Sequence, residues 1–210
     1  MSPSASKLTA LPAALSSASP AEDAPEPPSS RVPTDAALVQ AALNGESWAQ
    51  AALFQRHVRA VIGLAHRLMP HAVEVDDLVQ DTFVYALQRL DSLKNPQAFA
   101  SWIYSIVVRT AAKRLRRQRL LVRLGLRTMT PVDLDQVLSK QASPEVASEL
   151  RLVYGLLESL PAEQRIALVL RRVEELELSE IAERMGLSVT TVKRRLAAAE
   201  TSLARARGPA

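Results

Sequence analysis

Cysteine is absent from this chain of 210 residues. Its absence excludes a disulfide framework and any metal site built from thiolates, and it is compatible with a reducing cytoplasm. Aromatic residues make up only 4% of the chain and glycine occurs six times, whereas strands favour aromatic and β-branched side chains. Alanine and leucine, which lead the helix-propensity scale, are abundant instead. The composition therefore predicts an all-α protein.

Long hydrophobic runs are also missing. No apolar stretch approaches the roughly 18–20 residues that a membrane-spanning helix needs, so we expect no membrane insertion. The apolar stretch Leu8–Leu15 faintly resembles a signal peptide, but it is short and Pro12 interrupts it. We therefore expect the protein to be cytoplasmic.

Patterns typical of enzymes and metal sites are scarce. The histidines His57, His66 and His71 have neither cysteine partners nor the spacing of a helical metal site, and we expect them to be packing or surface residues. There is no Gly-x-Ser-x-Gly nucleophile motif and no glycine-rich phosphate loop. The sequence predicts no catalytic residue, no metal and no cofactor.

The chain divides into segments by composition. Residues 1–33 hold seven of the thirteen prolines, and such a stretch buries too little apolar surface to fold, so we expect a disordered tail. Residues 34–120 and 144–207 carry helical periodicity, whereas residues 121–143 carry none that is sustained. We therefore expect two small helical domains joined by a flexible linker.

The first block predicts several helices. Thr34 is a plausible cap for a short helix that ends near Asn44, and a longer helix stops at Met69 before a proline. A third helix is expected over 74–91, and Asn95 followed by proline opens a fourth that runs into a basic segment. The expected apolar faces are Phe54, Val58, Val61, Ala65 and Leu68 in the second helix and Val79, Phe83, Ala86 and Leu90 in the third.

The second block predicts helices at about 145–159, 161–174, 178–185 and 188–206. The last two have the features of a helix-turn-helix. Ala182 is small where the helices would cross, Gly186 can adopt positive φ at the turn, and Val192 anchors the second helix, which Ser188 caps. With Val192 inward, Thr190, Lys193 and Arg194 point outward, with Thr191 and Arg195 at the flanks. Hydroxyls and cations there suit a DNA major groove, although an ordinary helical hairpin with a solvated face remains open.

Charge is concentrated in two places. Eight basic residues and no acidic one lie between positions 109 and 127, namely Arg109, Lys113, Arg114, Arg116, Arg117, Arg119, Arg123 and Arg127. Such a block repels itself unless it is solvated or docked on an anion. The third helix carries a polar face formed by Asp76, Asp77, Gln80 and Asp81. This face is either a docking surface or simply solvated.

Four segments resemble one family. The residues of 76–83, Asp-Asp-Leu-Val-Gln-Asp-Thr-Phe, closely resemble region 2.2 of extracytoplasmic-function (ECF) sigma factors of the sigma-70 superfamily. Residues 178–196 resemble its region 4.2. Residues 99–104 and the arginine-rich run after them resemble regions 2.3 and 2.4, and residues 160–165 resemble the start of region 4.1. The similarity extends over both folded blocks in the family's order and spacing.

The resemblance implies a sigma factor that directs promoter-specific initiation through −10 melting and −35 recognition. It implies docking on RNA polymerase core, at the β′ clamp helices and the β flap, with Asp76, Asp77, Gln80 and Asp81 on the clamp. It implies −10 contacts, on double- and single-stranded promoter DNA, by Ser92, Lys94, Asn95, Trp102, Arg109, Lys113, Arg116 and Arg117. It implies −35 contacts by Ser188, Thr190, Thr191, Lys193, Arg194 and Arg195. Many members are held inactive by an anti-sigma factor, which is a candidate partner here.

The sequence departs from the family pattern at a few positions. The family usually continues after Leu196 with His and Arg, whereas residues 197–200 here are Ala-Ala-Ala-Glu, so phosphate anchoring should be weaker there. Glu175 stands where the family often has glycine, and Ser105 and Val108 replace commoner polar or basic residues.

Two other classes of protein remain as alternatives. A dimeric helix-turn-helix regulator acting without core polymerase would explain 178–196 and the basic run, but not the acidic face or the two-block order. It would recognise a palindrome. A helical protein-interaction scaffold would show no salt-dependent binding to nucleic acid, whereas phosphate contacts produce a steep salt dependence.

Overall fold

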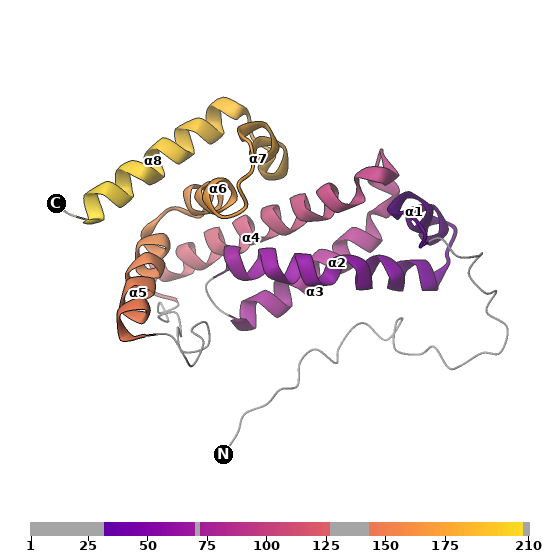
Figure 1. Ribbon diagram of the computed structural model, residues 1–210, viewed down its shortest axis with the longest axis horizontal. Helices are drawn as coiled ribbons and strands as arrows, with labels where there is room; N and C mark the ends of the chain where they lie inside the picture. Colours follow the sequence, from indigo (N-terminus) through magenta and orange to yellow (C-terminus); the bar gives the residue numbers. More distant parts are fainter. Residues whose placement is uncertain (1–31, 70–71, 127–142, 208–210) are drawn as a thin grey trace, which may run out of the picture.

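The computed structural model describes residues 32–69, 72–126 and 143–207, and all regular structure in these ranges is helical. The tail predicted at 1–33 and the linker predicted at 121–143 lie largely outside them. The elements are α1 (Asp35–Leu43), α2 (Ser47–Leu68), α3 (Ala72–Gln88), the 3₁₀ turns η1 (Leu90–Ser92) and η2 (Pro96–Ala98), α4 (Phe99–Arg123), α5 (Pro144–Ser159), α6 (Ala162–Arg172), α7 (Leu178–Met185) and α8 (Val189–Arg207) (Figure 1). The all-α prediction and each predicted helix are confirmed.

Local capping chemistry explains where several helices begin and end. The Thr34 hydroxyl accepts a hydrogen bond from the backbone N–H of Ala37 at 3.3 Å, as the prediction of an N-cap requires. Asn95 caps η2 in the same way, because its Oδ1 accepts from the N–H of Gln97 at 3.1 Å. Gly45 follows α1 with a φ of +90°, a conformation that glycine adopts without steric cost.

Helices α1 to α4 form a first unit, and α2 packs against α1, α3 and α4. Because these helices and also α6 pack against it, the buried face of α2 is wider than the single stripe predicted from its sequence. Leu53, His57 and Leu64 are buried, whereas Phe54 and Val58 are only half-buried. The Phe54 ring meets Phe83 of α3 edge-on, with ring centroids 4.7 Å apart.

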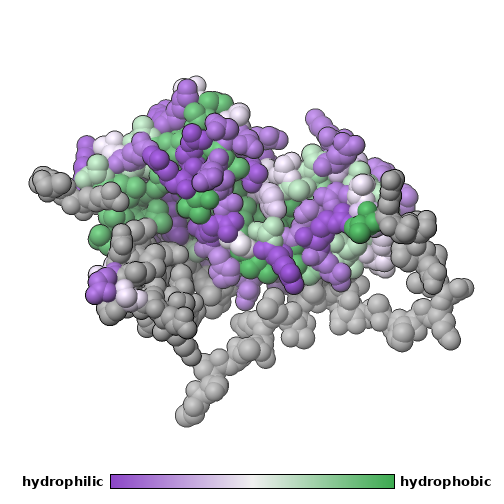
Figure 2. Space-filling view, viewed as in Figure 1, coloured by the Kyte–Doolittle hydropathy of each residue, from purple (hydrophilic) through white to green (hydrophobic). Residues whose placement is uncertain are grey.

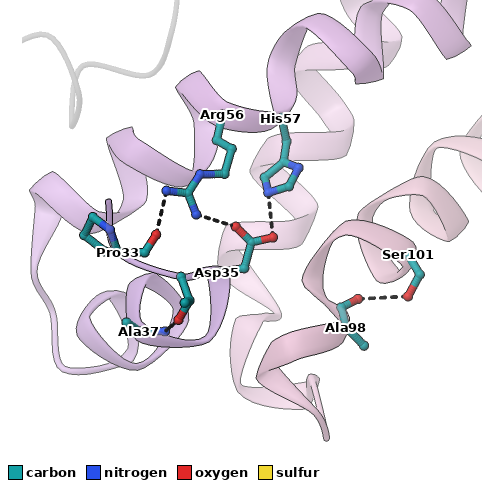
Figure 3. A network of polar contacts seen from close by, with 8 residues as sticks. Pro33, Asp35, Ala37, Arg56, His57, Ala98 and Ser101 are labelled. Atoms are coloured by element: carbon teal, nitrogen blue, oxygen red, sulfur yellow. Dashed lines mark hydrogen bonds and ion pairs between the residues drawn. The ribbon is translucent and has the colours of Figure 1, made fainter. Parts of the chain in front are cut away.

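A polar network fastens α1 to α2 (Figure 3). Asp35 Oδ1 accepts a hydrogen bond from Arg56 Nη1 at 2.7 Å, and Asp35 Oδ2 lies 3.0 Å from Nε2 of the buried His57. The other Arg56 nitrogen, Nη2, donates to the carbonyl of Pro33 at 2.7 Å. Burial raises the pKa of Asp35, but its interactions with Arg56 and His57 outweigh this and lower the pKa overall. The carboxylate is therefore held in its charged form.

Of the other two histidines, His66 is exposed, and His71 lies outside the described residues. Among the residues that the structure describes, no group of three carboxylate or histidine side chains is placed to hold a metal ion. None of the described helices is both long enough and apolar enough to cross a bilayer.

Helices α5 to α8 form a second unit, which lies directly on α4 of the first. Figure 1 shows α4 between α2 on one side and α6 and α7 on the other, and α4 packs against α2, α3, α6 and α7. Buried apolar residues of α4, α6 and α7 belong to one continuous core. Helix α4 also extends to Arg123, beyond the predicted boundary at 120, and its Arg119 donates to the carbonyl of Glu158 in α5 at 2.8 Å.

We predict that Asp35→Asn destabilises the protein by about 1–2 kcal/mol at pH 7, because it removes the charge that faces Arg56 and His57, which solvent screens in part. The pKa of Asp35 is lowered in the folded state. Its contribution is therefore present above the unfolded value of about 3.9 and is lost as pH falls through the folded pKa. Urea unfolding from pH 7 down to pH 3 measures this. A difference between wild type and variant that stays constant with pH would contradict the assignment, and Asp91→Asn, an exposed carboxylate, is the control.

Candidate nucleic-acid interface

The polar face predicted on α3 is present as one surface. Asp76, Asp77, Gln80 and Asp81 are all exposed, while Leu78 between them is buried against the first unit. Three- and four-residue spacing places them on neighbouring turns of one side of the helix.

This acidic face is joined to α4 through Arg114. The guanidinium of Arg114 forms an ion pair with Asp81, and its Nη2 donates to the carbonyl of Asp77 at 3.1 Å. One of the eight basic residues of the 109–127 run therefore anchors the acidic face and is not available to an external anion.

The segment between α3 and α4 presents polar side chains beside an aromatic pair. Ser92, Lys94 and Asn95 are exposed on η1, η2 and the turn between them. Trp102, in the second turn of α4, is half-buried, and its ring centroid lies 6.0 Å from that of the buried Phe99 at an interplanar angle of 53°. An exposed loop next to a partly open indole can accept an unstacked base.

The basic run on α4 is divided between solvent and the second unit. Lys113 and Arg117 are exposed on the surface of α4. Arg109 Nη2 donates to the carbonyl of Glu183 in α7 at 3.2 Å, and Arg116 Nη1 lies 3.0 Å from Oε1 of Glu163 in α6. Burial lowers the pKa of the Arg119 guanidinium.

The helix-turn-helix prediction is confirmed in its geometry. Ala182 is buried at the crossing, and Gly186 adopts a φ of +66° at the turn. Ser188 caps α8, because its Oγ accepts from the N–H of Thr191 at 3.2 Å. The inward face consists of Val192, Leu196, Ala199 and the half-buried Leu203.

The outward face of α8 is open at its first turns. Thr190, Lys193 and Arg194 are exposed, and Thr191 is half-buried at the flank. Arg195 differs from them, because its Nη2 lies 2.5 Å from Oε2 of Glu163. In the view of Figure 2, hydrophilic side chains are interspersed with apolar ones over the part of the molecule where α6 to α8 lie.

The turn before the motif is strained at one residue. Glu175 adopts a φ of +55°, the left-handed region that disfavours residues with a Cβ atom. The N–H of Leu176, the next residue, donates back to the carbonyl of Leu170 at 3.0 Å and closes the end of α6. The backbone thus keeps a conformation suited to glycine although the sequence supplies glutamate.

Three glutamates that contact the first unit were not found from the sequence. Glu163 joins Arg116 to Arg195, Glu174 forms an ion pair with Arg67 of α2, and the carbonyl of Glu183 accepts from Arg109. Their partners in the first unit lie dozens of residues away along the chain, and no local periodicity connects them. Nothing in the sequence indicated that Glu163 and Glu174 contact the first unit, because exposed glutamates are common on helices.

Comparison with known proteins places these surfaces in a family. The sigma-70 region 2 family matches residues 53–120, and the sigma-70 region 4 family matches residues 150–203. The ECF RNA polymerase sigma-E factors of Escherichia coli strain K12 and of Salmonella typhimurium strain LT2 are each 33% identical to this chain over 177 residues, covering 78% of this chain and 88% of theirs.

Two solved structures have a similar arrangement. CnrH, in complex with the cytosolic domain of CnrY, is 29% identical with a TM-score of 0.52, and the match covers 81% of this chain and 95% of CnrH. The sigma factor RpoE of Bartonella quintana, in complex with the anti-sigma factor NepR, is 21% identical with a TM-score of 0.53, covering 73% and 92%, and shows the same fold.

We predict that Glu175→Gly stabilises the protein by roughly 0.5–1 kcal/mol, because the relief of left-handed strain exceeds the entropy cost of glycine. Gly186→Ala should have the opposite effect, a loss of about 1 kcal/mol, since it places a Cβ on a left-handed residue. Urea unfolding of the full chain measures both. A destabilised Glu175→Gly protein would mean that the glutamate side chain contributes more than the strain costs.

Proposed function

Since the chain belongs to the ECF sigma factors of the sigma-70 family, we propose that it docks on RNA polymerase core through α3 and contacts promoter DNA through α4 and α8. As an ECF sigma factor it directs transcription initiation and is not itself an enzyme. The observation that carries this conclusion is the presence of both sigma regions in one chain, with 33% identity to sigma-E factors over 177 residues.

Docking on core uses the acidic face of α3. Its exposed carboxylates, Asp76, Asp77 and Asp81, together with Gln80, form a surface that suits the β′ clamp helices. The ion pair between Arg114 and Asp81 keeps this surface in a fixed position relative to α4. Docking of α3 thereby sets the position of the DNA-binding helix on the enzyme, and the second unit, residues 144–207, docks on the β flap.

Contact with the −10 element uses the first unit, residues 34–120. Ser92, Lys94 and Asn95 are exposed beside Trp102, where an extruded base of the melted strand stacks. The cations Arg109, Lys113, Arg116 and Arg117 then lie along promoter phosphates. Capture of the unpaired strand makes strand separation favourable at this sequence, and the polymerase supplies all covalent chemistry.

Contact with the −35 element uses α8 as the recognition helix. The exposed Thr190, Lys193 and Arg194 face the major groove, with Ser188, Thr191 and Arg195 at its edges. Beyond Arg195 the surface of α8 carries Ala197 and Glu200, which add no positive charge. Base readout is therefore concentrated in the first two turns of the helix.

We also propose that the protein is located in the cytoplasm and is regulated by a partner protein. CnrH and RpoE were each solved in complex with a second protein, the cytosolic domain of CnrY and the anti-sigma factor NepR. An anti-sigma factor that covers the core-docking faces is the corresponding partner for this chain. Co-purification from unstressed cells tests this, and recovery of the chain without any such partner would contradict it.

Reconstituted initiation tests the function directly. The purified chain, added to core polymerase with a library of promoter fragments, should start transcription at fragments that share a two-part sequence. DNA binding that does not depend on core, at palindromic sites, would instead establish the dimeric regulator. A folded chain that binds neither core nor DNA would contradict the proposed role.

Variants in the same assay test the division of labour. Asp77→Lys should lower core affinity at least tenfold, because it places a like charge in a complementary interface, while Glu46→Lys, an equal charge change elsewhere on the first unit, should not. Arg194→Ala should spare core binding but weaken −35 recognition by about 1–3 kcal/mol, with Arg205→Ala as the matched control on α8. Equal loss of both activities in Asp77→Lys and Arg194→Ala would contradict the separate roles.

A further inference from the structure

His57 of α2 is a buried titratable residue that none of the proposed contacts uses. Only 7% of the residue is exposed. Its Nε2 lies 3.0 Å from Oδ2 of Asp35 in α1, and Figure 3 shows the imidazole pointing toward that carboxylate. The same ring also meets the ring of Phe99, with centroids 5.2 Å apart and an interplanar angle of 53°. One histidine therefore connects α1 to the first turn of α4.

The ring contacts continue from Phe99 to the tryptophan proposed to receive a base. Phe99 is fully buried, and its ring centroid lies 6.0 Å from that of the half-buried Trp102. Both centroid distances are typical of interacting aromatic rings. Side chains in a close-packed interior pass a displacement on to their neighbours. A shift of the His57 ring therefore reaches Trp102 through Phe99.

The polar side of the same site also rests on α1. Helix α1 packs against η1 and η2, the two turns that carry or flank the exposed residues of 92–95. Arg56 holds the start of α1 on α2, because one of its nitrogens lies 2.7 Å from Asp35 Oδ1 and the other donates to the Pro33 carbonyl at 2.7 Å. Asp35 thus holds both the position of α1 against this loop and the orientation of the His57 ring.

We propose that His57 is a positioning residue for the −10 strand, which together with Asp35 fixes the Phe99 ring and so keeps the Trp102 indole ready to stack on an unpaired base. His57 is too deeply buried to touch DNA, so its effect passes through Trp102. The negative charge of Asp35 favours a proton on the imidazole nitrogen that faces it, which holds the ring in one orientation. This inference rests on the proposed function for the identity of the base, whereas the ring contacts are independent of it.

The expected effect is on affinity for the unpaired strand alone. An indole that is fixed in advance binds a base more tightly than one that must be ordered on binding, because less conformational freedom is lost. Stacking of one base on an aromatic side chain contributes roughly fivefold to a hundredfold in affinity. A loosened Trp102 should lose part of this contribution, about threefold to tenfold. Docking on core through α3 and −35 binding through α8 involve none of these rings and should not change.

Fluorescence of Trp102 in the free chain tests the positioning without DNA. The chain has two tryptophans, so Trp48→Phe leaves Trp102 as the only indole. Quenching by acrylamide should increase in His57→Gln, which keeps a side-chain N–H for Asp35 but loses the ring against Phe99. It should also increase in Asp35→Asn, which leaves all three rings in place and only removes the charge that orients the first of them.

Leu64→Ala separates positioning from general destabilisation. Leu64 is buried in α2, two turns after His57, and its truncation destabilises the same unit. Urea unfolding identifies conditions in which every variant is folded, and under them Leu64→Ala should leave the quenching of Trp102 unchanged. A His57 that merely fills the core predicts that Leu64→Ala and His57→Gln change the quenching alike, and that result would overturn the proposal.

Binding of the −10 strand tests the consequence. The probe is a single-stranded oligonucleotide with the non-template −10 sequence of the fragments that initiate, added to core polymerase assembled with each variant. His57→Gln and Asp35→Asn should each weaken its binding by about threefold to tenfold, with core affinity and −35 duplex binding unchanged. The double variant should lose no more than the more affected single variant, because both changes act through the same ring.

The outcomes separate the two proposals. Unchanged affinity of His57→Gln for the oligonucleotide, or losses that add in the double variant, would overturn the positioning role. Failure of the wild type to initiate at any fragment would instead contradict the proposed function, and the quenching of Trp102 would still decide whether His57 and Asp35 position the indole.

Discussion

The packing of α4 against both halves of the chain is the constraint on which the other features depend. Its buried residues run from Phe99 to Leu115 and join the core of the first unit to that of the second. The basic side chains of α4 lie on the same helical turns as these buried residues, because the helix has an apolar face and a basic face over the same part of its length. Lys113 and Arg117 already face solvent. Arg109 and Arg116 contact α7 and α6, so a movement that frees them also separates helices of the shared apolar core. Promoter contact by Arg109 and Arg116, if they bind DNA as proposed, is thereby coupled to the relative position of the two units.

Acidic and basic side chains lie on separate surfaces of the molecule. This arrangement suits one cationic partner and one anionic partner. Arg114 connects the acidic face of α3 to α4, through its ion pair with Asp81 and its hydrogen bond to the carbonyl of Asp77. One arginine of α4, Arg116, and one of α8, Arg195, converge instead on Glu163. If α4 and α8 bind promoter DNA as proposed, Arg116 and Arg195 must first leave this carboxylate.

Much of the fold could be predicted from the sequence, because helix periodicity, caps and the helix-turn-helix spacing are local signals. Thr34 and Ser188 cap helices as predicted, and Val192 faces inward with Lys193 and Arg194 outward. Asn95, predicted to cap the fourth helix, caps the 3₁₀ turn η2 that precedes it. The apolar stripe predicted on α2 matches the buried face only in part. Phe54 and Val58 lie at the margin of that face, because a helix packed on several sides buries more than one stripe of side chains. The roles of Glu163, Glu174 and Arg67 could not be predicted, since each depends on contacts between residues far apart in the sequence. The left-handed Glu175 shows that a family's glycine position can keep its backbone conformation after the glycine is replaced.

A reversible covalent lock tests most directly whether separation of the units is required for initiation. Arg67→Cys and Glu174→Cys, joined by a short reducible thiol crosslinker, would hold the units in the arrangement seen here without altering any proposed core or DNA contact. The account predicts that the crosslinked chain fails to initiate with core polymerase and regains activity when the link is reduced. A crosslink between Arg172→Cys and Glu200→Cys, within the second unit, should have no effect. Full initiation by the locked chain would contradict the account.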